Sequence, residues 1–472
     1  MSTAARAHNR AVPLIASAVL MLASAALVAV ITNPVPSVPG VDVQWWNLLA
    51  WVVAALALVV VLRTPRGRGT TALLVAGAVM VGAAALGAPP RFSDDSARYA
   101  WDGTVSTSGL SPYAHPPVAA ELARLRPEWL FPPVGAGPDG AAWCTEPGSR
   151  LAAQTPDGAP LCTLINRPEV PTIYPPVAQA WFAGVRAAVP REAAWWPMQV
   201  AGLVLSLAVT IVLIAGLRRR GLDDRWAAVW AWSPFVAVEA VNNAHIDSLG
   251  VLFALAATFA LTGARRPGWL GTVRPLLGGV LLGLAAATKM VPLMVAPPLL
   301  RRTPGRVLLA AAATLAAVYL PFVLLGGSDV LGYLPGYLAE ERYPDGSRFA
   351  LVAAVLPGPA ATWVALAMLL VAAVLAWWRA DPDRPWHAQT MLVGTVLLVV
   401  NPLYAWYALT LIPFVALSRR WEWLFVPLAL SINSGMAPRP VVLGVAAVVV
   451  TVAMVARRVG AGTPRPVLEE VR

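Results

Sequence analysis

Long apolar runs separated by short polar segments dominate this 472-residue chain. Many runs approach the about 20 residues that an α-helix needs to cross the hydrocarbon core of a bilayer. We therefore predict an all-α polytopic membrane protein with about 12 to 14 transmembrane helices, the shorter runs being half-helices paired through a turn. The predicted spans lie near residues 12–31, 46–62, 71–88, 195–217, 226–243, 247–263, 273–288, 290–300, 306–325, 350–378, 386–401, 403–418, 421–435 and 440–457.

The composition supports a lipid environment. Hydrophobic residues make up 58% of the chain and charged residues only 12%, about half of the roughly 25% that a soluble domain carries. The net charge of +11 does not indicate nucleic-acid binding, because the arginines form short clusters between apolar runs and no extended basic face.

The first apolar run, 12–31, follows Arg6 and Arg10 and resembles a signal peptide. It is long, it lacks a small-residue cleavage site, and further spans follow it. We therefore expect a retained signal-anchor.

The arginine clusters predict the orientation, because cytoplasmic loops are enriched in basic residues. With the N-terminus inside, the predicted spans place every cluster on the cytoplasmic side of the plasma membrane. The clusters are 63–68, 218–225, 265–266, 301–306, 379–384, 419–420 and 457–458.

This orientation requires that residues 174–189 do not cross the membrane, and we expect a juxtamembrane or re-entrant helix there. Two segments are then extracytoplasmic, a large first loop at 89–194 and a second outer loop at 326–349. The predicted parts are N-terminal transmembrane helices (1–88), the extracytoplasmic loop (89–194), a transmembrane bundle (195–458) and a cytoplasmic tail (459–472).

Both cysteines of the chain, Cys144 and Cys162, lie in the large outer loop. An extracytoplasmic location permits oxidation, and a disulfide there would stabilise the loop by about 3 kcal/mol. Two free thiols are the alternative. Without clustered histidines the pair does not indicate a zinc site.

Adjacent carboxylates, Asp94 and Asp95, follow directly after the third predicted span. Burial of such a pair at the mouth of a bundle raises at least one pKa, which suits a general base that takes a proton from a sugar hydroxyl. The alternative is a solvated helix cap, since Asp often begins a helix after an apolar run.

A second polar cluster ends the fifth predicted span and comprises Glu239, Asn242, Asn243, His245 and Asp247. Ionisable groups at this depth are costly and usually face a cavity. Because His245 and Asp247 are two residues apart, they would not share one helical face, and a helix break fits better. The alternative is a polar contact between helices.

Lys289 is the only lysine of the chain and lies in a predicted hairpin turn at the outer face. An ammonium in apolar surroundings needs an anion, and a lipid phosphate is the obvious candidate. The alternative is that Lys289 extends to the lipid headgroups.

Two further polar or aromatic groups are predicted on the same face. The second outer loop carries Glu340, Glu341, Arg342 and Arg348. The turn near 401–407 carries Asn401, Pro402, Tyr404, Trp406 and Tyr407. Aromatic residues at this depth form either an interfacial belt or stacking faces for sugars.

Taken in order, these motifs resemble the polyprenyl-phosphate-mannose-dependent mannosyltransferases of the GT-C superfamily, which build lipomannan and phosphatidylinositol mannosides in high-GC Gram-positive bacteria. The resemblance spans roughly residues 91–418. It rests on the runs SDDSARYAWDG, GLSPYAHPP, YPPVAQ, NNAHIDSLG, AATKMVPLMVAPPLL and NPLYAWYALTLIPF.

The resemblance implies a GT-C-like bundle and an inverting transfer of a hexose from a polyprenyl-phosphate carrier to a lipid-linked glycan. Asp95 matches the family's catalytic base, with Asp94 as its partner or alternative. Lys289, with His245 and Arg342, would neutralise the departing phosphate. The residues expected to line the substrate site are Tyr99, Trp101, Asp102, Tyr113, Tyr174, Asn243, Asp247, Tyr404, Trp406 and Tyr407.

The residues also support a lipid-linked donor independently of the resemblance. No predicted cytoplasmic loop is long enough for a nucleotide-binding domain, and no glycine-rich phosphate loop is present. We expect no cofactor; an Asp pair can hold a divalent cation, but we do not favour one.

Two other classes of function remain. A transporter or flippase of a lipid-linked saccharide would place its ionisable residues near the bilayer midplane, whereas here they collect at span ends. A scaffold protein would not need the Asp94–Asp95 pair.

Overall fold

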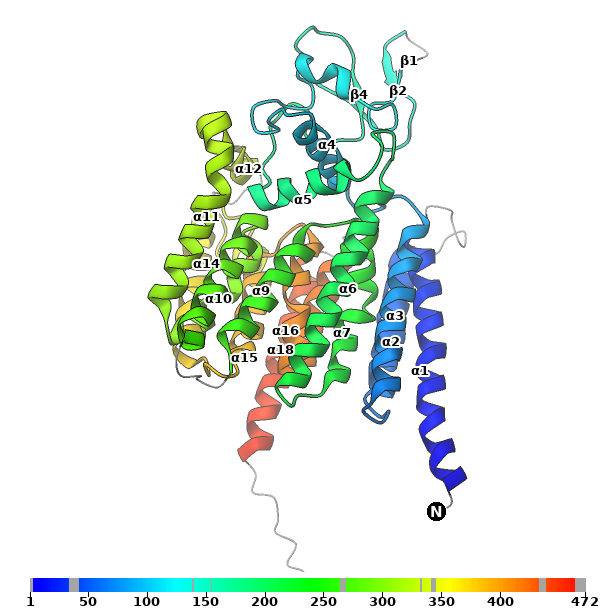
Figure 1. Cartoon of the computed structure of the whole chain (residues 1–472), viewed down its shortest axis with the longest axis vertical. Helices are drawn as coiled ribbons and strands as arrows, with labels where there is room; N and C mark the ends of the chain where they lie inside the picture. The colour runs from blue at the N-terminus through cyan, green and yellow to red at the C-terminus, as the bar shows by residue number, and fades with distance from the viewer. Residues whose placement is uncertain are drawn as a thin grey trace, which may run out of the picture.

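The computed structural model describes residues 3–33, 42–137, 140–153, 155–263, 269–331, 333–340, 345–432 and 439–462. It confirms an all-α polytopic membrane protein. Helices run roughly parallel in a bundle, and among the described residues short strands occur only in one loop above it (Figure 1).

Seven helices in the described part of the chain are long and apolar enough to cross a bilayer. They are α1 (Thr3–Thr32), α2 (Val43–Val61), α3 (Arg68–Ala84, continued by the turn η1, Ala85–Gly87), α6 (Trp196–Arg219), α11 (Pro304–Gly326), α14 (Pro359–Arg379) and α18 (Arg439–Gly462). An eighth crossing results if Pro234–Asn242 and Asp247–Leu261, which meet at a bend of 117°, count as one broken span.

This number is below the 12 to 14 predicted from hydropathy, because the remaining apolar runs form short or broken helices. Prolines such as Pro292, Pro297 and Pro298 interrupt them by removing backbone donors. These elements are η3 (Asp224–Ala227), α7 (Ala228–Ala231), α8 (Pro234–Val236), η4 (Ala237–Asn242), α9 (Asp247–Leu261), α10 (Trp269–Thr288, whose apolar part is Val273–Thr288), η5 (Val291–Val295), η6 (Pro297–Arg301), α15 (Trp386–Val400), η8 (Ala405–Thr410), α16 (Ile412–Ser418), η9 (Trp421–Leu424) and α17 (Phe425–Ser431).

The two ends of the bundle differ: a layer of loops covers one end, and arginine clusters lie at the other. We call the end that carries residues 89–194 the loop end and the opposite end the arginine end (Figure 1). At the arginine end, clusters far apart in sequence lie close together. Ion pairs there join Arg66 to Asp223 (3.3 Å), Arg302 to Asp383 (2.7 Å) and Arg457 to Glu422 (2.9 Å).

Above the loop end, residues 89–194 form a small layer of short elements. These are α4 (Asp95–Thr107), η2 (Ala120–Leu125), β1 (Val134–Ala136), β2 (Ala142–Cys144), β3 (Arg150–Leu151), β4 (Cys162–Thr163) and α5 (Pro176–Ala187). Strands β1 and β2 pair antiparallel, as do β3 and β4, with Leu151 opposite Cys162.

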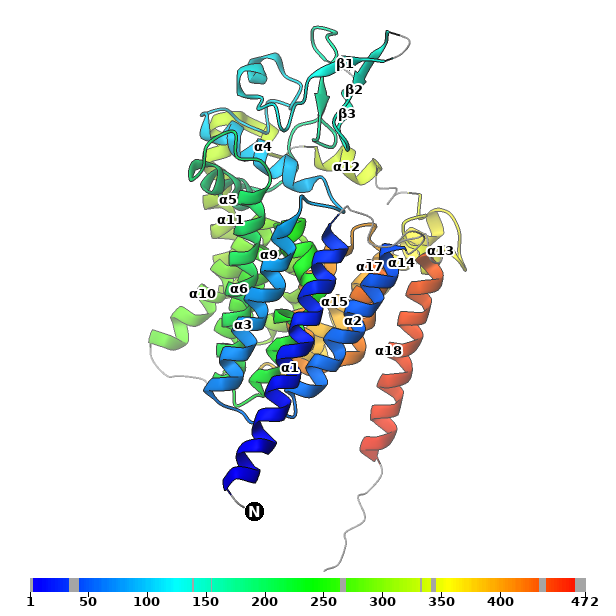
Figure 2. The same cartoon turned by 90° about the vertical axis from the view of Figure 1, so that its right-hand side faces the viewer.

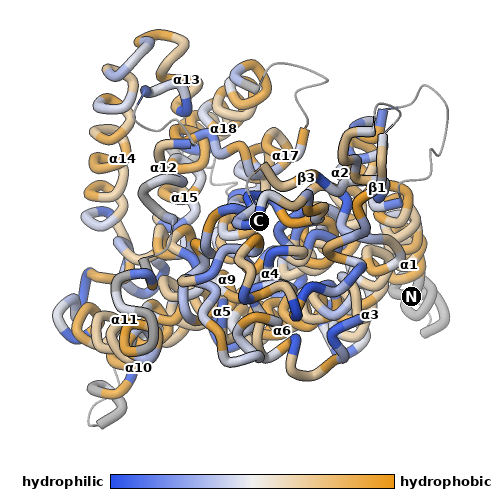
Figure 3. The backbone as a smooth tube through the Cα atoms, turned by 90° about the horizontal axis from the view of Figure 1, so that it is seen from above, coloured by the Kyte–Doolittle hydropathy of each residue, from blue (hydrophilic) through white to orange (hydrophobic). Residues whose placement is uncertain are grey.

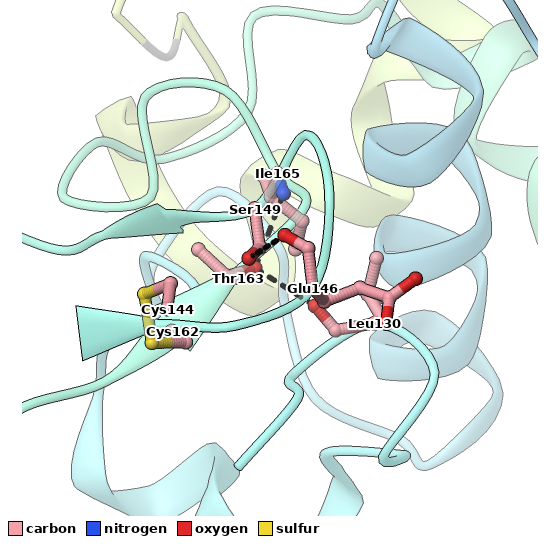
Figure 4. The surroundings of a disulfide bond; sticks show 7 residues. All are labelled: Leu130, Cys144, Glu146, Ser149, Cys162, Thr163 and Ile165. Carbon is pink, nitrogen blue, oxygen red and sulfur yellow. Dashed lines mark hydrogen bonds between the residues drawn. A yellow bond between two sulfur atoms is a disulfide. The ribbon is translucent and has the colours of Figure 1, made fainter. Parts of the chain in front are cut away.

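A disulfide joins Cys144 at the end of β2 to Cys162 at the start of β4, as predicted (Figure 4). The neighbouring Thr163 hydroxyl donates to the carbonyl of Leu130 (3.1 Å) and accepts from the amide of Ile165 (3.1 Å). The bridge joins the two hairpins, and the Thr163 hydroxyl ties β4 to the segment that precedes β1.

Helix α5 does not cross the bundle; it lies across its loop end (Figure 1). Its 12 residues extend about 18 Å, well short of the roughly 30 Å of a hydrocarbon core. Helix α4 packs closely on α5, because Gly103 has no side chain to clash with the carbonyl of Phe182. The juxtamembrane helix predicted near 174–189 agrees with this arrangement.

The second outer loop contributes η7 (Gly327–Leu331) and α12 (Leu334–Glu340), and α13 (Ala350–Ala353) follows it. Helix α12 lies at the loop end of the bundle (Figure 2). Glu341 and Arg342 fall outside the described residues.

Small residues allow close packing inside the bundle, as is common for membrane helices. Gly202 of α6 abuts the carbonyl of Ala240, and Gly279 of α10 abuts that of Val307. Viewed from above, the peripheral helices α11 and α14 are largely hydrophobic, and hydrophilic segments gather near α4, α5 and α9 (Figure 3).

Candidate active site

The Asp94–Asp95 pair is positioned by a helix break in a distant part of the sequence. Asp94 directly precedes α4, and Asp95 is its first residue. The approach to α4 is held by Asn242 Oδ1, which accepts from the amide of Arg91 (3.1 Å), and by Asn243 Oδ1, which accepts from the amide of Phe92 (3.1 Å). The break after η4 therefore anchors the acidic pair to the bundle.

Three side chains donate hydrogen bonds to the Asp95 carboxylate. Tyr174 and Tyr99 donate their hydroxyls to Oδ2 (3.1 and 3.3 Å), and Asn166 donates its amide to Oδ1 (3.3 Å). The Asp95 side chain keeps 14% of its surface exposed, so it is both oriented and accessible.

Behind Asp95, the imidazole of His245 lies between two carboxylates. Its Nδ1 is 3.6 Å from Asp95 Oδ2, and its Nε2 is 3.3 Å from Glu239 Oε2. The ring is fully buried and stacks on Trp406 with centroids 3.7 Å apart. His245 therefore supports the acidic site from below and does not line the cavity to which it was assigned as a phosphate ligand.

The predicted break between His245 and Asp247 is present, and it contains an unusual backbone conformation. Ala244 has φ of +56°, in the left-handed region that costs an alanine about 1–2 kcal/mol. Such strain clusters at functional sites. The turn lets Asn243 reach Phe92 and lets His245 reach Asp95.

Lys289 follows the end of α10 and has an anionic partner within the protein. Its Nζ donates to Asp247 Oδ2 at 2.7 Å, and Asp247 is fully buried at the start of α9. The ammonium also lies 4.8 Å from the ring centroid of Tyr407. Asp247 therefore supplies one anion from within the chain, and the prediction that Lys289 also binds a lipid phosphate stays a prediction.

The acidic pair and Lys289 meet at a cavity of about 610 Å³ at the loop end. Asp95, Asp94 and Lys289 all line it. The other lining residues come from both outer loops and from the turn after α15: Arg91, Phe92, Ser93, Arg98, Asn166, Arg167, Val170, Pro171, Ile173, Tyr174, Tyr333, Tyr337, Leu403, Tyr404, Trp406 and Tyr407.

Several predicted lining residues lie behind the cavity wall. Tyr99 and Asn243 are buried and hold Asp95 and Phe92. Trp101 packs on Phe131 with ring centroids 4.8 Å apart, away from the cavity.

Asp102 and Tyr113 also have internal partners. Asp102 accepts from Arg98 Nε (2.9 Å) and Gln179 Nε2 (3.0 Å), and the Tyr113 hydroxyl donates to the carbonyl of Tyr174 (2.7 Å). Both are buried, so the structure places them as supports of the loop layer.

Sequence reasoning missed a set of cavity residues in the loops. Asn166 contacts Asp95 directly, and Arg167 pairs with Glu340 of α12 (Nε to Oε2, 2.8 Å). Tyr337 of α12 shares a hydrogen bond with Tyr407 (3.3 Å). These residues lie in segments without hydrophobic periodicity, and only their closeness in the fold connects them to the site.

Asp94 differs from its neighbour in environment. It is paired with Arg150 of β3 and is nearly half exposed. Burial raises the pKa of the Asp94 carboxyl above its ordinary value; the charge and hydrogen bond of Arg150 lower it, and the charge of Asp95 raises it. Asp94 is therefore engaged by a cation, whereas Asp95 receives neutral donors.

Among the described residues, no group of three or more His, Cys, Asp or Glu side chains is arranged to hold a metal ion. Asp95, His245 and Glu239 form a row and do not converge on one point, because His245 separates the carboxylates.

Comparison with known proteins adds one finding. Residues 172–402, a little under half of the chain, match the model of Glycosyltransferase family 87. No curated protein matches the chain, and no solved structure does. The matched segment includes Tyr174, Glu239, His245 and Lys289 but begins after Asp95. This similarity supports a membrane glycosyltransferase.

Proposed function

We propose that this protein is an inverting membrane glycosyltransferase that moves a hexose from a polyprenyl-phosphate carrier to a lipid-linked glycan acceptor. The observation that carries the proposal is that Asp95 and Lys289, which are far apart in the chain, line one cavity. Mannose is the proposed sugar on the basis of the sequence resemblance.

In the proposed reaction, Asp95 acts as the general base. An acceptor hydroxyl attacks C1 of the sugar, and its proton passes to the Asp95 carboxylate. The bond between C1 and the phosphate oxygen breaks, and the lipid phosphate leaves with the electron pair. The hydrogen bonds from Tyr99, Tyr174 and Asn166 orient the carboxylate for this step.

Asp95 is favoured over Asp94 as the base because of their partners. Asp94 forms an ion pair with Arg150 that occupies its Oδ2, whereas Asp95 is held by hydroxyl and amide donors that orient it in the cavity. In the proposal, Asp94 positions the acceptor or holds Arg150 at the cavity rim.

Lys289 is the proposed partner of the carrier phosphate. Asp247 occupies one side of its ammonium, and lysine has three donors, which leaves others for a phosphate. Arg91 and Arg167 also line the cavity, and they add positive charge where the leaving group develops negative charge. Arg342 lies outside the described residues and stays an expectation.

Aromatic side chains provide the proposed sugar surface. Tyr404 stacks on Trp406 with centroids 4.8 Å apart, and Tyr407 lies edge-on to Trp406. All three line the cavity. Flat apolar ring faces of this kind suit the C–H face of a hexose.

We further propose that the loop end faces the outside of the plasma membrane. The arginine clusters in the described part of the chain gather at the other end, which the distribution of basic residues assigns to the cytoplasm. A donor used on the outer face must then arrive with the membrane, and this agrees with a lipid carrier.

The test is transfer by the purified full chain in proteoliposomes that contain radiolabelled polyprenyl-phosphate mannose and lipid-linked mannoside acceptor. We expect Asp95→Asn to lower the turnover by about 10²–10⁴-fold, the range that general base catalysis contributes. Asp157→Asn, an exposed carboxyl of the same loop, is the matched control and should keep the wild-type rate. Unchanged transfer by Asp95→Asn would overturn the proposed base.

The same vesicles separate the enzyme from a transporter or flippase. A transporter would move the labelled carrier between leaflets and form no glycosidic product. Carrier translocation without product, under conditions in which donor and acceptor are both supplied, would overturn the proposed function.

A further inference from the structure

A second large cavity lies at the arginine end, between α6, α9 and α10. Its volume is about 670 Å³, and three arginines line it: Arg219 and Arg220 at the end of α6 and Arg274 in α10. Its other described lining residues are mostly apolar, among them Phe259, Leu277 and Leu281, and none is acidic.

Neutral groups hold two of these arginines in place. Arg220 donates to the carbonyl of Phe259 (3.0 Å) and to the hydroxyl of Thr262 (2.7 Å), and its guanidinium lies 4.3 Å from the ring centroid of Phe259. Arg274 donates to the carbonyl of Thr262 (2.7 Å). The guanidinium groups are therefore oriented at the end of α9 without a carboxylate to neutralise them.

Other arginines at this end differ, because carboxylates of the chain neutralise them. Arg218 pairs with Asp224 (2.6 Å), Arg225 with Asp223 (2.7 Å), and Arg302 with Asp383 (2.7 Å). In the described part of the chain, no carboxylate oxygen lies within 4.0 Å of Arg219, Arg220 or Arg274. Burial, followed by the charges of Arg274 and Arg219, lowers the pKa of Arg220 to about 10, because both effects disfavour the charged form.

We propose that this cavity binds one anionic phospholipid, with its headgroup phosphate between Arg220, Arg274 and Arg219. A basic pocket between membrane helices at the cytoplasmic side is a suitable site for an anionic headgroup. The apolar walls next to the arginines extend along the surface of α10, where Leu277 is 47% exposed. A soluble anion would need the guanidinium groups but not these walls, so the cavity matches a headgroup joined to acyl chains.

The site is separate from the proposed active site, because the two cavities share no lining residue. The end of α6 that carries Arg219 lies opposite the loop end (Figure 1). Helices α9 and α10 nevertheless connect the two ends. Asp247 begins α9 and Lys289 follows α10, and the lipid cavity lies between the far ends of these two helices. A bound lipid would therefore hold together the two helices that carry the Lys289–Asp247 pair.

Lipid binding can be tested without a transfer assay. The delipidated full chain in neutral detergent would be titrated with palmitoyl-oleoyl phosphatidylglycerol, and bound lipid counted by native mass spectrometry alongside thermal melting. Phosphatidylcholine with the same acyl chains and glycerol 3-phosphate are the two other ligands. We expect one phosphatidylglycerol to bind and raise the Tm, with weaker binding of the other two.

Variants then locate the site. We expect Arg274→Gln to weaken phosphatidylglycerol binding at least tenfold and Arg274→Lys to restore part of it. Arg306→Gln, an exposed arginine at the start of α11, is the matched control and should bind as wild type does. Arg220→Gln is a second variant of the site and should also weaken phosphatidylglycerol binding. Circular dichroism and gel filtration identify the variants that fold. If Arg220→Gln does not fold, the Arg274 variants alone test the site.

Three results would overturn the proposal. Equal binding of phosphatidylcholine would show that charge does not select the ligand. Equal loss in Arg274→Gln and Arg306→Gln would show a diffuse surface effect in place of a site, and glycerol 3-phosphate binding as tightly as the lipid would make it a soluble-anion site.

Discussion

Lys289 and Asp247 form an ion pair of 2.7 Å at the loop end of the bundle, and the carboxylate is fully buried. The pair joins the end of α10 to the start of α9. Lys289 is therefore a structural partner of Asp247 and also a lining residue of the cavity. These two roles predict different outcomes for stability and for transfer.

Removing one partner of this pair should destabilise the protein. We expect Asp247→Asn or Lys289→Gln alone to cost about 3–5 kcal/mol, because each leaves an uncompensated or poorly satisfied buried group. The double variant Asp247→Asn, Lys289→Gln should regain most of the stability but not the transfer rate, since the cavity has lost its ammonium. Thermal melting and transfer assays on all four proteins measure both effects; recovery of transfer in the double variant would contradict the phosphate role.

The Tyr174 hydroxyl should matter to catalysis through Asp95. Tyr174→Phe removes a 3.1 Å hydrogen bond to the proposed base, and hydrogen bonds to charged groups contribute about 1.5–3 kcal/mol. We expect kcat to fall about tenfold or more. Tyr113→Phe, another buried tyrosine whose hydroxyl contacts only a backbone carbonyl among its described partners, is the control. It should lower stability slightly and leave kcat near the wild-type value; equal losses in both variants would contradict the catalytic role of Tyr174.

Local patterns predicted the all-α bundle, the non-crossing helix α5 and the break between His245 and Asp247. Hydropathy and helical periodicity depend on neighbouring residues, so one sequence carries that information. The 12 to 14 predicted spans include short half-helices, and seven helices in the described part of the chain are long enough to cross a bilayer alone. Prolines such as Pro292 and Pro297 break other apolar runs that hydropathy counts as spans.

Pairings across the fold could not be predicted in the same way. The sequence singled out Lys289 and Asp247, but 42 residues separate them, and nothing local indicates that each is the other's partner. Asn166 and Arg167 carry no signal at all, because the loop around them has neither periodicity nor a motif. Conversely, Asp102 and Trp101 follow the acidic pair closely, yet helix α4 turns them toward the loop core.

The stability conferred by Asp94 should depend on pH. Its pKa in the folded protein is raised above the ordinary 3.8, first by burial. The folded state therefore binds this proton more tightly than the unfolded state, so the contribution of Asp94 to stability improves as the pH falls through the raised pKa toward 3.8. Asp94→Asn lacks this dependence.

We therefore expect Asp94→Asn to melt at a higher temperature than wild type at pH 7, with a difference that shrinks as the pH approaches 4. Melting curves in detergent at a series of pH values measure it, and Asp157→Asn is the exposed control. A lower Tm for Asp94→Asn at pH 7 would mean that attraction to Arg150 outweighs the cost of burial.

The ion pair between Arg167 and Glu340 should control access to the cavity. It joins the first outer loop to α12, and Tyr337 of α12 lines the cavity beside Arg167. Both charges are more than one-third exposed, so the pair contributes at most about 1 kcal/mol to stability.

We expect Arg167→Glu to raise the KM for the lipid donor, because two like charges then separate α12 from the loop. Adding Glu340→Arg in the same chain should restore part of the wild-type KM. A charge exchange of Arg302 and Asp383, a comparable exposed pair at the arginine end, is the control and should leave the KM unchanged. If the Arg167 and Glu340 exchange fails to recover KM while both single variants keep their Tm, the cavity depends on the Arg167 guanidinium itself and α12 is not held by this pair.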